Sequence, residues 1–229
     1  MIICLTGFMG CGKSSVGKEL ATLLSCDYAD LDAVIEATAG RSIPEIFATD
    51  GEAAFRRMEQ EALEAVIAAY LEGDQIRGCE PECSRGPLPN KFESLPLRGG
   101  AKMPLPHSRL TSTDLVLSLG GGTVMTPACS DLVHEHTTCI YLRATIDTLL
   151  SHLADEASSR PLLASPAPDS TSGSSATAAA EAGHSPLRQR ISTLMSQRSS
   201  TYEKTSHIII DTDGKSIGSI TSEILRKLH

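Results

Sequence analysis

The stretch Gly7-Phe8-Met9-Gly10-Cys11-Gly12-Lys13-Ser14 stands between a short apolar run and a helical pattern. It fits G-x-x-x-x-G-K-[ST], in which glycines let the backbone turn its N–H groups onto a phosphate. Lys13 can then reach the β- and γ-phosphates, and the hydroxyl of Ser14 is placed to ligate Mg²⁺. Such a loop requires a strand before it and a helix after it, and the sequence predicts both, over residues 2–5 and 13–25. The stretch therefore predicts a nucleoside triphosphate site rather than a chance glycine-rich turn, although it does not indicate what receives the phosphate.

Outward from this loop, short apolar runs alternate with helical patterns along the chain. Continuous apolar runs lie at residues 115–119, 138–142 and 207–210, and such runs suit strands that are covered on both faces. Helical patterns cover about residues 32–40 and 52–70. This alternation predicts an α/β protein with three layers, α/β/α, built around a parallel sheet of about five strands.

Two stretches interrupt this alternation. Residues 72–111 contain several prolines and glycines with hardly any periodicity, and residues 164–186 are rich in serine, alanine and proline. Neither offers enough apolar area to offset the entropy of ordering the chain. We therefore expect a single domain over residues 1–229, with loop insertions at 72–111 and 164–186. Cys79 and Cys83 lie in the first insertion, but two thiols spaced C-x3-C without a second pair do not predict a zinc site.

The composition excludes several classes of function. The 28 acidic residues outnumber the 20 basic ones, and the net charge of −8 disfavours binding to nucleic acid phosphates. No apolar run approaches the length of a membrane-spanning helix, and the N-terminus does not read as a signal peptide. The seven scattered cysteines fit reduced thiols. We expect a monomer in the cytoplasm, with neither a nucleic acid nor a membrane as partner.

Further motifs concern the phosphate acceptor. The switch threonine, D-x-x-G turn and N-K-x-D base reader of a GTPase are not found where they should be. Instead the chain carries Asp30-Leu31-Asp32, Gly40-Arg41-Ser42-Ile43, Phe55-Arg56-Arg57-Met58-Glu59 and Gly120-Gly121-Gly122. Together with the phosphate loop, these motifs resemble shikimate kinase, a family with the nucleoside monophosphate kinase-like P-loop fold. The resemblance covers about residues 1–70 and 114–163, and more loosely 187–229.

This resemblance implies an ATP-dependent kinase that uses Mg²⁺ and transfers the γ-phosphate to the 3-hydroxyl of shikimate. Two alternatives stay open. One is a related small-molecule kinase such as gluconate kinase, against which Arg56, Glu59 and the triple glycine argue. The other is a non-catalytic, kinase-like protein that binds a ligand or partner through its insertions.

The resemblance also implies a role for each site residue. Asp32 lies near the attacking hydroxyl, Glu59 holds Arg56 in place, and Arg160 belongs to a lid that residues 164–186 make unusually long. The implied catalytic residues are Lys13, Asp32 and Arg160. The implied nucleotide-binding residues are Gly10, Cys11, Gly12, Lys13, Ser14, Ser15 and Arg160. The implied substrate-binding residues are Asp32, Arg56, Gly120, Gly121, Gly122 and Arg198, and the implied metal-site residues are Ser14 and Asp30.

The chemistry of these residue types agrees with those roles. Two guanidinium groups can fix a carboxylate in one plane, and a carboxylate beside the hydroxyls can take a proton. Each residue also has a structural explanation: Asp32 precedes a helix and could cap it, and Arg56 and Glu59 are spaced as a surface ion pair. The chain departs from the family at residues 150–153, where His152 stands in place of an adenine-packing arginine. Residues 211–214, where the adenine loop of the family lies, read only as a turn.

Overall fold

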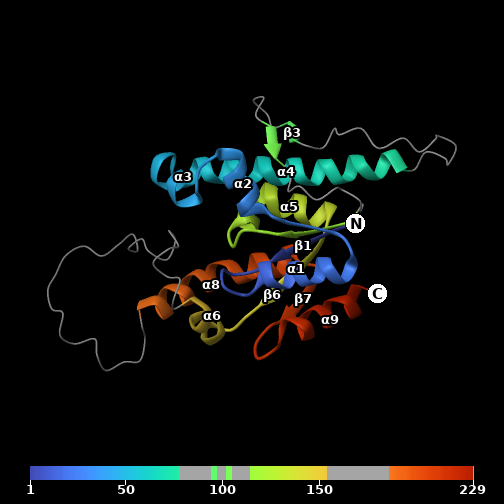
Figure 1. The fold of residues 1–229 in the computed structure, drawn as a ribbon. Helices are drawn as coiled ribbons and strands as arrows, with labels where there is room; N and C mark the ends of the chain where they lie inside the picture. Colours follow the sequence, from blue (N-terminus) through green and yellow to red (C-terminus); the bar gives the residue numbers. More distant parts are fainter. Residues whose placement is uncertain (78–93, 97–101, 105–113, 154–185, 229) are drawn as a thin grey trace, which may run out of the picture.

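A computed structural model describes residues 1–77, 94–96, 102–104, 114–153 and 186–228. Its main sheet has five parallel strands in the order β2-β5-β1-β6-β7. The strands are β1 (Ile2–Thr6), β2 (Asp27–Asp30), β5 (Leu115–Ser118), β6 (Thr138–Arg143) and β7 (Ile208–Asp211). The predicted parallel α/β sheet is thereby confirmed (Figure 1).

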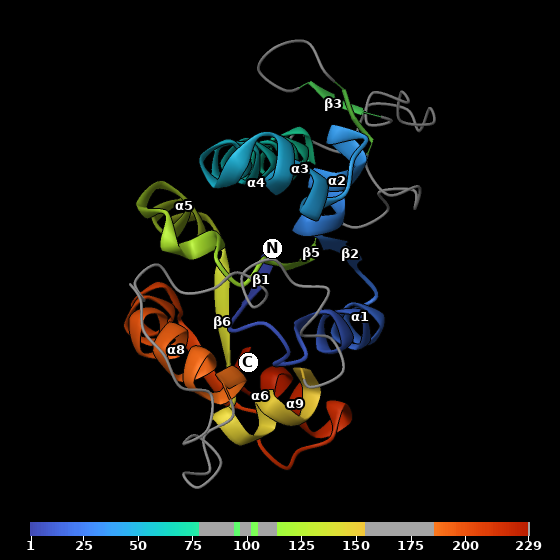
Figure 2. The ribbon, with the colours of Figure 1, turned by 90° about the vertical axis from the view of Figure 1, so that its left-hand side faces the viewer.

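Helices cover both faces of this sheet, as Figure 2 shows. The helices are α1 (Lys13–Leu24), α2 (Leu31–Ala39), α3 (Ile43–Thr49), α4 (Gly51–Arg77), α5 (Pro127–His136), α6 (Ile146–Leu153), α8 (Pro186–Thr205) and α9 (Ile217–Leu228), with a short 3₁₀ helix, η1 (Thr123–Met125). Helices α2, α4 and α5 contribute to one apolar cluster and α1, α6 and α9 to the other. Helix α8 contributes to both, through Tyr202 on one side and Ile191 on the other.

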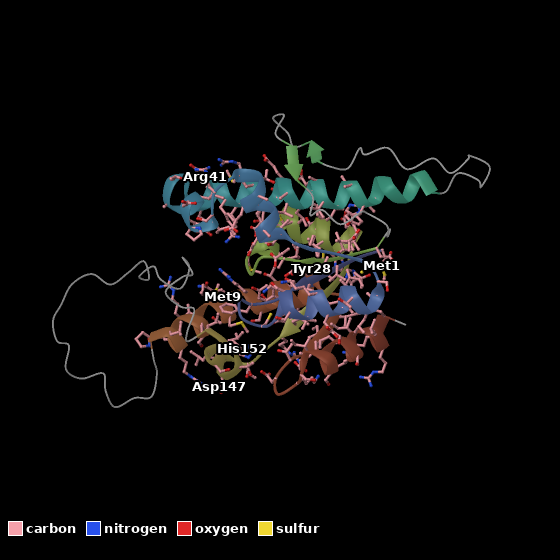
Figure 3. All side chains as sticks on the ribbon, in the orientation of Figure 1. Met1, Met9, Tyr28, Arg41, Asp147 and His152 are labelled. Atoms are coloured by element: carbon pink, nitrogen blue, oxygen red, sulfur yellow. The ribbon has the colours of Figure 1, made fainter. Side chains whose placement is uncertain are left out.

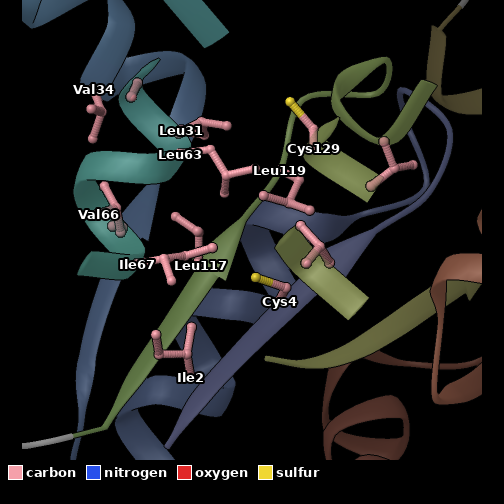
Figure 4. Packing of buried hydrophobic residues seen from close by; sticks show 14 of the residues in the cluster. Ile2, Cys4, Leu31, Val34, Leu63, Val66, Ile67, Leu117, Leu119 and Cys129 are labelled. Carbon is pink, nitrogen blue, oxygen red and sulfur yellow. The ribbon is translucent and has the colours of Figure 1, made fainter. Parts of the chain in front are cut away.

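The first of these clusters shows why the strand sequences are continuously apolar. In Figure 4, Ile2 and Cys4 of β1 and Leu117 of β5 pack against Leu63 and Ile67 of α4. Alternate residues of the same strands, such as Ile3 and Val116, are buried in the cluster on the opposite face. Because both faces are covered, every position of β1 is buried.

Two elements depart from the sequence prediction. Strand β2 reads Asp-Tyr-Ala-Asp, and it lies at the edge of the sheet with only one residue fully buried, so it lacks an apolar run. Helix α3 begins at a capping box in which Ser42 and Glu45 satisfy each other's backbone N–H groups. That signal was available in the sequence, but seven residues are too few for a helical apolar period to stand out.

The expectation of a loop throughout residues 72–111 is wrong in part. Helix α4 continues to Arg77, and β3 (Ser94–Pro96) and β4 (Lys102–Pro104) form a two-stranded antiparallel sheet. The other residues of this insertion, including Cys79 and Cys83, lie outside the described residues, as do residues 164–185 of the second insertion. Within the part of the chain that is described, no helix combines the length and apolar character needed to cross a membrane.

Candidate active site

The phosphate loop joins the carboxyl end of β1 to the first turn of α1. Three of its glycines have a positive φ, at 144° for Gly7, 81° for Gly10 and 91° for Gly12. A side chain at Gly7 would also lie 2.6 Å from the carbonyl oxygen of Leu142. The glycines of this loop are therefore required by the backbone conformation itself.

Lys13 and Ser14 extend from the start of α1 toward the loop and the neighbouring strand. The ammonium of Lys13 donates to the carbonyl oxygens of Gly7 and Phe8, at 3.0 Å each. The hydroxyl of Ser14 donates to Oδ2 of Asp30 at 2.9 Å. A hydroxyl and a carboxylate side by side are oxygen ligands of the kind that Mg²⁺ takes when nucleotide phosphates supply the rest. The donor set of Ser14 and Asp30 therefore fits this metal.

Asp30 ends β2 and also caps α2. Its Oδ1 accepts from the backbone N–H of Asp32 at 3.2 Å, and its Oδ2 accepts from the hydroxyl of Tyr28 at 3.2 Å as well as from Ser14. The alternative in which Asp32 caps the helix is wrong, because Asp32 lies within the first turn of α2. The carboxylate of Asp32 is thus not used in capping.

The surroundings of Asp32 disfavour its charged form. Burial, followed by the negative charges of Asp30 and Glu59, raises the pKa of Asp32 to about 6, against the opposing charge of Lys13. A carboxylate with a pKa near neutrality can take up a proton and release it again at physiological pH. Asp32 therefore has the electrostatics of a general base.

Arg56 lies on α4 and is held from two sides. Its Nη1 donates to Oε2 of Glu59 at 2.7 Å, and its Nη2 donates to Oε1 of Glu52 at 3.1 Å. Glu59 is only 1% exposed, and its Oε1 accepts from the hydroxyl of Thr123 at 2.6 Å. The pair of Arg56 and Glu59 is therefore not the surface ion pair that its spacing also allowed, because one partner is buried and anchored.

The triple glycine follows β5 and lies against these side chains. A Cβ at Gly120 would lie 2.8 Å from Oδ1 of Asp32 and 3.0 Å from Oε1 of Glu59. A Cβ at Gly122 would lie 2.7 Å from Nη1 of Arg56. None of the three residues has a positive φ. Gly120 and Gly122 are therefore required by the close approach of Asp32, Glu59 and Arg56 rather than by the turn. At Gly121, a Cβ would instead lie 3.3 Å from the backbone nitrogen of Met9.

Helix α8 contributes the last described part of the site. Arg198 is 9% exposed, and its Nη1 donates to the carbonyl oxygen of Gly121 at 3.2 Å. Tyr202, one turn further on, donates to the same oxygen. The guanidinium of Arg198 also lies 6.0 Å from the ring centroid of Phe8, in the phosphate loop. Arg198 is thus brought beside the triple glycine and the phosphate loop, whereas Arg160 lies outside the described residues.

A cavity of about 620 Å³ connects these groups. Its lining includes all predicted residues from Gly10 to Ser15, with Asp30, Asp32 and Gly121. Arg56, Arg198, Gly120 and Gly122 are not part of this lining, although their contacts bring them to the Asp32 side of the site.

The cavity also has lining residues that sequence reasoning did not assign. Thr212, Lys215, Ser216 and Ile217 extend it beyond the carboxyl end of β7. The signal for them was the turn at residues 211–214, since ligands of open parallel sheets bind outside the carboxyl ends of the strands.

His152, at the end of α6, closes one side of this cavity. Its Nδ1 lies 2.8 Å from the carbonyl oxygen of Gly10, so the imidazole contacts the phosphate loop directly. In Figure 3, Met9 and His152 lie on one side of the molecule and Met1 on the other. The site thus lies at the carboxyl ends of the strands, opposite the N-terminus.

Comparison with known proteins identifies the relatives of the chain. A family model described as shikimate kinase matches residues 9–72 and 107–229. The shikimate kinase of Chlorobaculum tepidum is 34% identical over 231 residues, which cover 100% of this chain and 90% of that protein. A shikimate kinase of Thermus thermophilus is 32% identical over 226 residues, covering 99% of this chain and 89% of that protein.

Solved structures agree on the fold. The shikimate kinase from Acinetobacter baumannii in complex with shikimate superposes with a TM-score of 0.68 at 22% identity, covering 99% of this chain and 92% of that one. The shikimate kinase from Bacteroides thetaiotaomicron gives a TM-score of 0.66 at 21% identity, covering 100% of this chain and 98% of that one. At this level of identity the likeness establishes the P-loop kinase fold and not the activity.

Proposed function

The chain belongs to the shikimate kinase family, and from this membership we propose that it transfers the γ-phosphate of ATP to the 3-hydroxyl of shikimate, giving shikimate 3-phosphate and ADP. The observation that carries the proposal is the meeting of Asp32, Glu59 and Arg56 around the triple glycine, next to the phosphate loop. An acid-base carboxylate and a guanidinium thereby stand within one site.

The nucleotide side of the site depends on Lys13 and Ser14. When ATP binds, the ammonium of Lys13 leaves its two loop carbonyls and neutralises charge on the β- and γ-phosphates. Ser14 would hold Mg²⁺ directly and Asp30 would hold it through water, and the metal supplies neutralisation of the phosphate charge when bound. Arg160 would add a further positive charge over the transferring group.

The acceptor side depends on Asp32 and two arginines. We assign to Asp32 the removal of the proton from the attacking hydroxyl, because its pKa of about 6 lets it accept a proton at pH 7. Arg56 and Arg198 would bind the carboxylate of shikimate, a task that suits paired guanidinium groups. Backbone N–H groups of the triple glycine would then meet the substrate where no side chain intervenes.

The test is ADP release measured in a coupled assay with ATP and Mg²⁺, in the presence and absence of shikimate. ADP release that depends on shikimate, with shikimate 3-phosphate identified as the product, is the expected result. Gluconate serves as the control acceptor and should give no release. Release that ignores shikimate, or that gluconate supports equally, would reject the proposal.

We further propose that the enzyme is a monomer of the cytoplasm with no nucleic acid or membrane partner. Its net charge of −8 supports the absence of a nucleic acid partner, because it repels phosphates. The insertions at 72–111 and 164–186 are proposed to be surface additions to a single domain. Light scattering coupled to gel filtration measures the mass directly, and a mass twice that of the chain would contradict the monomer.

A further inference from the structure

The two carboxylates that hold Arg56 differ in how firmly they are held themselves. Glu59 is buried, and both of its oxygens accept hydrogen bonds, from Arg56 and from Thr123. The side chain of Glu52 is 57% exposed, and among the described residues Arg56 is its only hydrogen-bond partner. One terminal nitrogen of the guanidinium is thus fixed to a buried anchor, and the other is held by an exposed side chain.

Removing the two carboxylates from Arg56 has very different consequences. Loss of Glu59 would leave a buried charge without its partner, which is strongly unfavourable. Loss of the exposed contact to Glu52, four residues earlier on α4, changes an equilibrium by only about twofold. Glu52 also lies in the first turn of α4, where the helix dipole stabilises a carboxylate whether or not it touches Arg56. Glu52 is therefore the partner that can leave at little cost.

An incoming carboxylate can compete most easily for the nitrogen that Glu52 holds. A guanidinium binds a carboxylate best through two adjacent N–H groups, and Glu59 already takes one N–H group of Nη1. The backbone at Gly122 closes against both terminal nitrogens, since a Cβ there would lie 2.7 and 2.8 Å from them. Because Glu59 is buried and Glu52 is exposed, Nη2 is the terminal nitrogen of Arg56 whose partner a substrate can displace.

We propose that Glu52 is a positioning residue that occupies Nη2 of Arg56 in the free enzyme and is displaced by the carboxylate of the substrate. This inference rests on the proposed function, since it takes Arg56 as the carboxylate binder. Glu52 then acts as an internal competitor. It keeps the guanidinium oriented in the absence of substrate and reduces the affinity for small anions that cannot also use the rest of the site.

The test is Glu52→Gln, which keeps the length of the side chain and removes its charge. We expect the Kd and KM for shikimate to fall about twofold, with kcat and the KM for ATP unchanged. Inhibition by acetate, a carboxylate without hydroxyls, should increase by a similar factor. The matched control is Glu61→Gln on the same helix, which removes an equal charge from an exposed position and should change none of these values.

The outcomes separate the inference from the function on which it rests. An unchanged or increased KM for shikimate in Glu52→Gln would overturn the inference, as would an equal fall in Glu61→Gln. The proposed function fails independently, if the unmodified enzyme releases no ADP in response to shikimate or releases it equally with gluconate. Because the contact is exposed, the effect of Glu52→Gln should also shrink when the salt concentration is raised from 0.05 to about 0.5 M.

Discussion

The two glycine-rich loops of the site use glycine for different reasons. In the phosphate loop, Gly7, Gly10 and Gly12 adopt a positive φ that other residues avoid. In the triple glycine, no residue has a positive φ, and the missing side chains of Gly120 and Gly122 make room for Asp32, Glu59 and Arg56. One loop is specified by its own backbone and the other by what packs against it.

This difference shows which sequence motifs can be interpreted without knowledge of the tertiary structure. The phosphate loop can be recognised locally, because its conformation and its function depend on the same eight residues. The triple glycine acquires its meaning only when α2 and α4 bring their side chains to it. Substitutions in the two loops should therefore affect the binding of different substrates.

Lys13→Ala should have the largest effect, because the β- and γ-phosphates lose their nearest cation. We expect kcat to fall about 10³-fold or more, while binding of shikimate to the free enzyme changes little. Steady-state kinetics and calorimetric titration with shikimate measure the two quantities. Activity close to that of the unmodified enzyme would remove the phosphate loop from the mechanism.

Asp32→Asn should come next, since the amide cannot take the proton of the substrate hydroxyl. General-base assistance contributes about 10²–10⁴-fold, and we expect kcat to fall within that range.

The raised pKa means that Asp32 contributes most to stability at low pH and that this contribution is lost as the pH rises through about 6. The variant should therefore be the more stable protein at pH 8, by roughly 1–3 kcal/mol. Thermal unfolding at pH 5 and pH 8 checks this, and a destabilised variant at pH 8 would show that Asp32 is structural.

Lowering the pH of the unmodified enzyme protonates Asp32 without changing the sequence. Because Asp32 must be ionised to accept a proton, kcat/KM for shikimate should fall about tenfold per pH unit below pH 6. The residual activity of Asp32→Asn should lack this limb of the profile. A break that persists in the variant would belong to another group.

Gly122→Ala tests the substrate loop with a single methyl group. The new Cβ would meet both terminal nitrogens of Arg56, and the anchored Glu59 prevents the guanidinium from simply moving aside. We expect the KM for shikimate to rise roughly tenfold, with the KM for ATP nearly unchanged. If the KM values for both substrates rise equally, the two loops are not separable.

Gly12→Ala is the matched change in the phosphate loop and should have the smallest effect. A Cβ at this position meets no heavy atom within 4 Å, so its cost is the strain of a residue with φ near 91°. We expect a loss of about 1–2 kcal/mol in unfolding free energy and no change in the KM for shikimate. Chemical denaturation measures the loss, and a rise in the KM for shikimate would show that strain in one loop reaches the other.

The parts of the fold that could be predicted are those with a local signal. The strands beginning at Ile2, Leu115 and Thr138 are continuously apolar because both faces are buried, and that pattern is visible in the sequence. Strand β2 could not be found in this way. It forms by pairing with β5 at the sheet edge, and its residues Asp27 and Asp30 favour a loop when read alone.

The residues of the candidate active site also differ in how far the sequence predicts them. The resemblance to a family provided Asp30, Arg56 with its partner Glu59, and Arg198, whereas the groups that hold Glu59 and Gly121 come from tertiary structure. Nothing in the local sequence indicates that Thr123 anchors Glu59 or that Tyr202 donates to Gly121. Such contacts join residues that lie far apart along the chain, so the spacing of residues in the sequence does not predict them.

The central position of β1 has a consequence for how the protein is made. β1 pairs with β5 and β6, both of which lie beyond the 72–111 insertion in the chain. During synthesis from the N-terminus, the phosphate loop therefore leaves the ribosome long before its supporting strands exist. Pairing these strands closes a loop between α4 and β5, and each doubling of the length of that loop adds only about 0.6 kcal/mol to the entropic cost of closing it. The nucleotide loop, first in the sequence, must accordingly be among the last parts of the enzyme to become rigid, and a sheet of such distant pairings is expected to fold slowly.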